Sequence, residues 1–171
     1  MAEKRLKIAF YSPYLTDHLG GGEKHLLDVA AVCAKAGAQV HICVPQAMSD
    51  ASLDQLRRQL ESTFGVAVAD FTWIRSPLFD AAFSWKKLNW TKQFDVLYFV
   101  TDGSLFFSLA KRNILHVQIP FTQPLSGDIQ RLKLRNWQSI QTNSGCTKSV
   151  IEASWHRNVD QVVHPLADET F

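Results

Sequence analysis

The chain has 171 residues, 46% of them hydrophobic, with 18 basic and 16 acidic side chains. This length and composition allow one buried core and exclude a disordered chain, and the near balance of charge gives no global field for binding nucleic acid. The sequence has no apolar run of about 18 residues and no apolar core of a signal peptide, so we expect a cytoplasmic protein whose membrane contact, if any, is peripheral. Its three widely spaced cysteines are expected to be reduced.

The predicted elements alternate between strand and helix. A short apolar run at residues 6–11 predicts a buried strand, and apolar residues three and four apart over 26–34 predict the helix that follows. Residues 38–45 predict a second strand, and the next helix begins at a cap near Ser49 and ends at Gly65. Further strands are predicted at 68–74, 96–100, 113–119, 139–142 and 161–164, and helices at 104–110 and 147–155. The alternation predicts an α/β fold, a Rossmann-like three-layer α/β/α sandwich with a mostly parallel central sheet in a single domain.

The least regular segment, residues 76–95, mixes aromatic residues with lysines. One interpretation is a helical insertion whose aromatic side chains pack inward while its lysines are solvated. The other is an amphipathic surface that meets anionic lipid through Trp85, Lys86, Lys87 and Trp90. Both interpretations stay open from the sequence. The other aromatic residues of the segment are Phe79, Phe83 and Phe94.

Three consecutive glycines, Gly20, Gly21 and Gly22, stand between the first strand and the first helix. The N–H groups and the dipole at a helix start attract anions, and glycine lets a phosphate approach the backbone. The alternative is a flexible turn with positive φ angles and no ligand. The pattern is not the dinucleotide-binding motif, because His25 stands at the position of its third glycine and no acidic residue follows the second strand, which ends at Pro45.

Several segments, taken in order, resemble the N-terminal half of glycosyltransferase family 4, the retaining, nucleotide-sugar-dependent enzymes of GT-B architecture. They are KIAFYSPYL, GGGEKHLLDVA, FDVLYFVTDG, NILHVQIPF, TNSGCTKSVIEASW and VVHPLAD. The resemblance implies that residues 1–171 are the acceptor-side domain. A C-terminal donor-binding domain is absent from this chain, since no two glutamates have the spacing of the family's E-x7-E motif. The complete protein would transfer a sugar, mannose or another hexose, to a hydroxyl of a glycan, lipid-linked or small-molecule acceptor, and the isolated domain would be inactive.

The resemblance also implies roles for individual residues on the donor side. Family members often carry a histidine that positions the donor sugar, and here Gln118 occupies that place, with His116 two residues earlier and on the same side of the strand. Either is a candidate catalytic residue, although a histidine on a buried strand is also an ordinary core residue. Glu23 has a second explanation, because a carboxylate in a first helical turn favours the helix dipole. The donor-binding residues implied are Gly20, Gly21, Gly22 and Glu23.

The acceptor side is assigned to segments that follow predicted strands, where the crevice of such folds lies. Asp102 and Ser104 have an alternative explanation as a turn and a helix cap, and Ser144 is likewise a good cap residue. The acceptor-binding residues implied are Asp17, His18, Asp102, Ser104 and Ser144.

The histidines and cysteines lack metal-ligand spacing, so we expect no metal and no cofactor, and the nucleotide sugar enters as a substrate. The expected partners are this donor, an acceptor and the protein's own C-terminal domain, with no nucleic acid. Two other classes stay open: a stand-alone module that binds a nucleotide or sugar without catalysis, and a different Rossmann-like enzyme such as a reductase.

Overall fold

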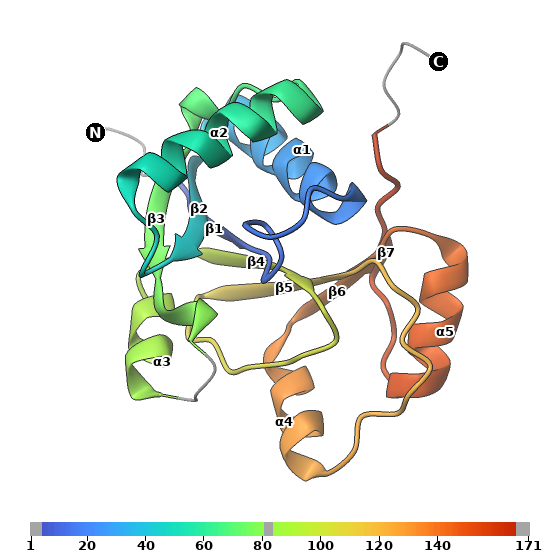
Figure 1. Cartoon of the computed structure of the whole chain (residues 1–171). Helices are drawn as coiled ribbons and strands as arrows, with labels where there is room; N and C mark the ends of the chain where they lie inside the picture. The colour runs from blue at the N-terminus through green and yellow to red at the C-terminus, as the bar shows by residue number, and fades with distance from the viewer. Residues whose placement is uncertain (1–4, 81–83, 167–171) are drawn as a thin grey trace.

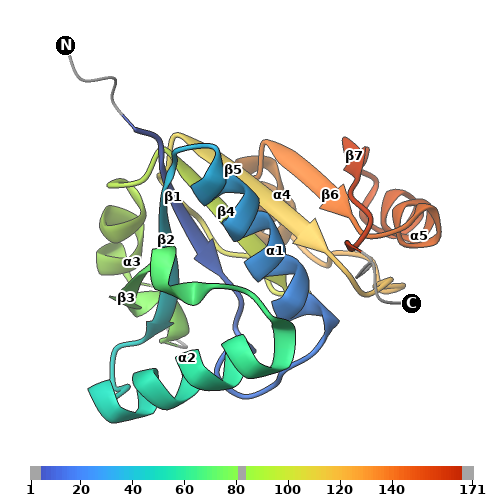
Figure 2. The ribbon, with the colours of Figure 1, turned by 90° about the horizontal axis from the view of Figure 1, so that it is seen from above.

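The apolar runs of the sequence form one sheet in the computed structural model, which describes residues 5–80 and 84–166. The sheet has seven strands in the order β3-β2-β1-β4-β5-β6-β7, and every neighbouring pair is parallel (Figure 2). The prediction of a Rossmann-like α/β/α sandwich is confirmed. The strands are β1 Lys7–Tyr11, β2 Gln39–Pro45, β3 Thr72–Ser76, β4 Val96–Thr101, β5 Arg112–Val117, β6 Ser139–Thr142 and β7 Gln161–Val162.

Helices cover both faces of the sheet (Figure 1). Side chains alternate along each strand, so in β1 Ile8 and Phe10 face α1 and α2, whereas Ala9 and Tyr11 face α3, α4 and α5. Two hydrophobic cores result, one on each side of the sheet. The helices are α1 Gly21–Lys35, α2 Asp50–Phe64, α3 Trp85–Thr91, α4 Asp128–Asn136 and α5 Gly145–Trp155, with short 3-10 turns at Val68–Asp70 and Pro77–Phe79.

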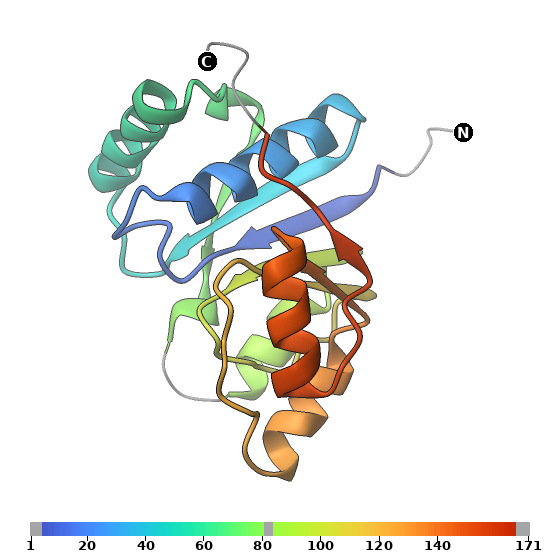
Figure 3. The same cartoon turned by 90° about the vertical axis from the view of Figure 1, so that its right-hand side faces the viewer.

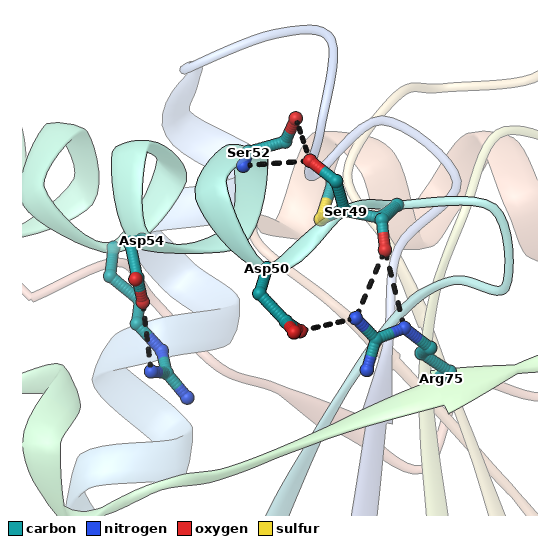
Figure 4. Close-up of polar contacts among 7 residues, drawn as sticks. Ser49, Asp50, Ser52, Asp54 and Arg75 are labelled. Atoms are coloured by element: carbon teal, nitrogen blue, oxygen red, sulfur yellow. Dashed lines mark hydrogen bonds and ion pairs between the residues drawn. The ribbon is translucent and has the colours of Figure 1, made fainter.

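The start of α2 shows how local chemistry fixes the layers (Figure 4). The Ser49 hydroxyl accepts the N–H of Ser52 at 3.1 Å, as the predicted cap requires. Arg75 of β3 donates to the carbonyl of Met48 at 3.1 Å and pairs with Asp50 at 2.5 Å. These contacts tie the helix to the edge strand.

The predicted helix over 104–110 is wrong, because this segment is irregular. Its backbone donors are bound by side chains from elsewhere in the chain. Ser108 N–H donates to Asn136 Oδ1 at 2.7 Å, and Leu109 N–H donates to Thr91 Oγ1 at 2.8 Å. Side-chain acceptors thus take the place of the carbonyls of a helix.

Other elements differ from the prediction mainly at their ends. The strand predicted over 68–74 is a 3-10 turn followed by β3, and the strands predicted over 113–119 and 161–164 end at Val117 and Val162. Helix α4 was not predicted. Its exposed apolar residues, Ile129 and Leu132, do not form the buried stripe that marks a helix in a sequence.

In the segment 76–95, the inward-packing interpretation fits most of the described aromatic residues. The rings of Trp90 and Phe94 lie 5.0 Å apart and pack on the core, whereas Trp85 is 74% exposed. Phe83 lies outside the described residues. The lipid contact stays a prediction. Among the described residues, no helix has the length and apolar character that crossing a bilayer requires.

Candidate functional site

The strand order reverses between β1 and β4, which are neighbours near the middle of the sheet. After β1 the chain builds β2 and β3 on one side, and from β4 onward it builds the other side. In open α/β sheets, the carboxyl ends of the strands at such a point form the ligand crevice. Every predicted site residue except His116 lies in a segment that follows a strand or in the first turn of α1. The topology therefore brings the predicted residues to one edge of the sheet.

The glycine turn differs from the sequence-based picture in one respect. Helix α1 begins at Gly21, so two of the three glycines belong to its first turn, and none of the three has a positive φ angle. The alternative of a positive-φ turn is therefore wrong. A Cβ at Gly22 would meet Gln118 Oε1 at 3.0 Å, and one at Gly20 would lie 3.3 Å from Glu23. Gly21 is exposed, and a Cβ there would have no atom within 4 Å among the described residues, so the fold itself does not require this glycine.

Glu23 caps α1. Its Oε2 accepts the N–H of Gly20 at 3.2 Å, and its Oε1 accepts the hydroxyl of Ser12 at 3.0 Å. Both Glu23 and Ser12 are buried, so the carboxylate joins the loop after β1 to the helix start. The capping explanation is confirmed, and a donor contact of Glu23 stays a prediction.

Gln118 follows β5 and stands beside Gly22. The backbone carbonyl of Gln118 accepts a hydrogen bond from Asn143 Nδ2 at 3.0 Å, and Asn143 Oδ1 in turn accepts a hydrogen bond from the hydroxyl of Thr147 at 2.9 Å. Ser144 caps α5 by accepting the N–H of Thr147 at 3.1 Å. The end of β5 is thus held between the first turns of α1 and α5. Sequence reasoning missed Asn143, whose only signal was its place directly after a strand.

His116 lies two residues before Gln118, within β5, and is fully buried. Its ring stacks on that of His25 at 4.0 Å, and neither of its nitrogens has a hydrogen-bond partner among the described residues. Burial, with a smaller contribution from His25, lowers the pKa of His116 to about 3, so the ring is neutral near pH 7. His25, which the sequence did not single out, shares a hydrogen bond of 3.1 Å with the Tyr98 hydroxyl, and burial lowers its pKa as well. The catalytic role of His116 stays a prediction about a side chain with no exposed surface.

A cavity of about 390 Å³ opens at the carboxyl ends of β1 and β4. Four of its lining residues are aromatic: Tyr11, Phe79, Phe106 and Phe107. The Tyr11 hydroxyl donates to the carbonyl of Leu78 at 3.1 Å. Burial first, and the charge of Asp102 second, raise the pKa of Tyr11, so the phenol stays protonated.

The polar part of this cavity contains two of the predicted acceptor residues. Asp102 and Ser104 both line it, and Asp102 Oδ1 accepts the N–H of Ser104 at 3.0 Å. The turn interpretation of Asp102 is therefore confirmed, whereas Ser104 as a helix cap is wrong, because no helix begins there; both residues remain in the cavity lining. Lys87 and Lys133 also line it, and Lys87 Nζ donates to the carbonyl of Asp80. Burial lowers the pKa of Lys87.

The other three predicted acceptor residues do not line this cavity, and one of them, Ser144, caps α5 instead. Asp17 and His18 are exposed in the loop after β1 and are not among the residues that line it. Asp17 accepts the Thr16 hydroxyl at 3.2 Å, and the ring of His18 lies 5.7 Å from that of Tyr14. Within residues 5–80 and 84–166, no group of three or more histidine, cysteine or acidic side chains could hold a metal ion.

Comparison with known proteins gives little beyond the fold. No protein-family model and no curated protein matches the chain. A similar solved structure is the terminal R domain from the myxalamid PKS-NRPS biosynthetic pathway, with 14% sequence identity and a TM-score of 0.45. The alignment covers 83% of this chain and 49% of that one, so the chain spans about half the length of that structure. A similarity of this size carries no argument about activity.

Proposed function

We propose that this chain is the acceptor-side domain of a retaining glycosyltransferase, which moves a sugar from a nucleotide diphosphate donor to an acceptor hydroxyl. The observation that carries the proposal is Gly21, an exposed glycine that neither a positive φ angle nor a close neighbour among residues 5–80 and 84–166 requires. Glycine loses more conformational freedom on folding than any other residue, and here it gains no contact in return among the described residues. A ligand that approaches the backbone at this point explains why no side chain is present.

The surroundings of Gly21 suit the diphosphate of such a donor. The first N–H groups of a helix have no partner within the helix, and the positive end of its dipole lies at the same point. The Gln118 side chain stands beside the next glycine and offers both a donor and an acceptor to sugar hydroxyls. Together these groups could bind a negatively charged leaving group and the sugar attached to it.

The cavity at the end of β4 suits the acceptor. Both the glycine turn and the cavity lie at the carboxyl end of β4: a Cβ at Gly22 would lie 3.9 Å from the side chain of Val100, and Asp102 directly follows the strand. The carboxylate of Asp102 can accept a hydrogen bond from an acceptor hydroxyl and orient it toward the donor. Such positioning, with stabilisation of the leaving diphosphate, is the main requirement of this reaction.

The same site suits a dinucleotide poorly. The end of β2 and the residue after it read CVPQ, so no acidic residue stands there to bind a ribose hydroxyl, and His25 replaces the third glycine of the dinucleotide motif. The reductase hypothesis therefore lacks its two characteristic contacts.

The test uses the full-length protein that contains this chain. We expect it to release nucleoside diphosphate from one member of a panel of UDP- and GDP-sugars, and to do so faster with an acceptor present. Gly21→Val should lower release at least about tenfold, whereas Ala51→Val, which enlarges an exposed residue in the first turn of α2, should leave it unchanged. No release from any donor would refute the proposal. Nucleotide binding by the 171-residue chain without turnover by the full-length protein would support the binding-module alternative instead.

A further inference from the structure

A groove of about 300 Å³ lies between α4 and α5, on the side of the molecule seen in Figure 3. Leu134 and Trp155, which are both buried, contribute apolar lining. Three arginines, Arg131, Arg135 and Arg157, also line it. No aspartate or glutamate is among the described residues that line the groove. It is separate from the glycine turn and from the cavity at the end of β4.

The fold brings the three guanidinium groups together. Arg131 and Arg135 are four residues apart on α4, so they share a face of that helix. Arg157 follows the end of α5, where His156 turns the chain with a φ angle of 51°. The clustering therefore comes from two elements rather than from one basic run in the sequence.

These charges are poorly compensated within the protein. Arg131 has one ion pair, with Asp128 at 3.9 Å, and both side chains are exposed, so the pair contributes little stability. Arg135 and Arg157 have no ion pair or side-chain hydrogen bond within the described part of the chain. The carboxyl end of α5 supplies only about half a negative charge, which is less than one arginine carries.

An external anion would compensate this cluster. The planar guanidinium fork matches the oxygens of a phosphate group and binds it through two parallel hydrogen bonds. The apolar lining of Leu134 and Trp155 keeps water away from part of the groove, which strengthens such contacts. We propose that the groove between α4 and α5 binds a phosphate group.

Two sources of that phosphate fit the surroundings. Ile129 and Leu132 of α4 are 63% and 54% exposed, and a lipid with a phosphate headgroup would cover such side chains. A free phosphate compound would use the arginines alone. The experiment therefore measures two kinds of binding. Calorimetry measures binding of inorganic diphosphate, and co-sedimentation measures binding to phosphatidylcholine vesicles with and without phosphatidic acid.

The test variant is Arg135→Gln with Arg157→Gln, and the matched control is Arg5→Gln with Arg112→Gln, which removes the same charge from two exposed arginines outside the groove. We expect the groove variant to weaken phosphate binding by about tenfold or more and the control to weaken it little. Circular dichroism should show both variants folded, because three of the four arginines are exposed and the fourth, Arg157, is only half-buried.

The outcomes separate the sources and the proposal. Binding of vesicles only with phosphatidic acid, lost in the groove variant, supports a lipid headgroup. Binding of free diphosphate, lost in the same variant, supports a soluble phosphate ligand. Failure of the wild-type chain to bind either probe, or an equal loss in the control variant, would overturn the proposal. None of these binding measurements depends on whether the protein is a glycosyltransferase, so this proposal and the proposed function can fail separately.

Discussion

The buried histidine pair predicts a marked loss of stability in mild acid. The pKa of His116 falls from 6.5 to about 3 on folding, chiefly because burial disfavours its charged form, with His25 as a second cause. Below pH 6.5 the unfolded chain therefore binds a proton that the folded chain does not. Stability from this residue is complete above pH 6.5 and declines as the pH falls toward 3.

The magnitude follows from the same two values. A difference from 6.5 to about 3 corresponds to about 5 kcal/mol in total, of which about 2 kcal/mol is lost by pH 5. Burial of His25 adds a loss of the same sign, because its pKa is also lowered. Since neither nitrogen of His116 has a partner among the described residues, His116→Leu removes a buried polar group without breaking a hydrogen bond.

Urea unfolding at pH 7 and pH 5 measures this effect. We expect wild type to lose about 2 kcal/mol more than His116→Leu between these two pH values. At pH 7 we expect the variant to stay within about 1.5 kcal/mol of wild type, as a cavity and the lost polar group offset each other. The matched control is His164→Asn at an exposed site. An equal pH dependence in wild type and His116→Leu would refute the reasoning.

Three further predictions concern the carboxyl edge of the sheet, and a fourth concerns the segment between β4 and β5. Gly21→Val should lower donor turnover of the full-length protein at least about tenfold and change the free energy of unfolding by less than about 1 kcal/mol. The control Ala51→Val should change stability as little and leave donor turnover unchanged. Glu23→Gln should lower stability by about 1–2 kcal/mol in thermal unfolding, because one amide oxygen replaces two capping acceptors, and an unchanged melting temperature would contradict this role. Asp102→Asn retains the turn acceptor for the N–H of Ser104, so it should raise the acceptor KM about tenfold while donor hydrolysis persists; loss of both would indicate a structural role. Asn136→Ala should speed proteolysis within residues 102–111, because the variant loses the two hydrogen bonds to the backbone of Ser108. Resistance equal to that of wild type would contradict this role of Asn136.

The sequence predicts those elements whose hydrophobic pattern is local. The core strands are short buried runs, and α1 and α2 have apolar stripes and end signals that need no knowledge of the fold. The segment 104–110 failed because Thr91 and Asn136 bind its backbone from 18 and 28 residues away in the chain. The sequence missed helix α4 for the opposite reason: Leu134 is the one buried residue of this helix, so it has no apolar stripe. In both cases the deciding contact, or its absence, is a property of the folded chain.

The candidate site divides along the same line. A glycine run after a strand can be found by inspection, and so can the polar residues that follow the other strands, because topology alone brings these positions to one edge. The role of each glycine can be seen only in the folded structure: Gly22 makes room for Gln118, whereas Gly21 makes room for no residue in the described part of the chain. Packing against Gln118 thus accounts for Gly22, whereas for its neighbour Gly21 we propose a ligand. Substitution of Gly22 therefore tests the packing of Gln118, and only substitution of Gly21 isolates the proposed ligand.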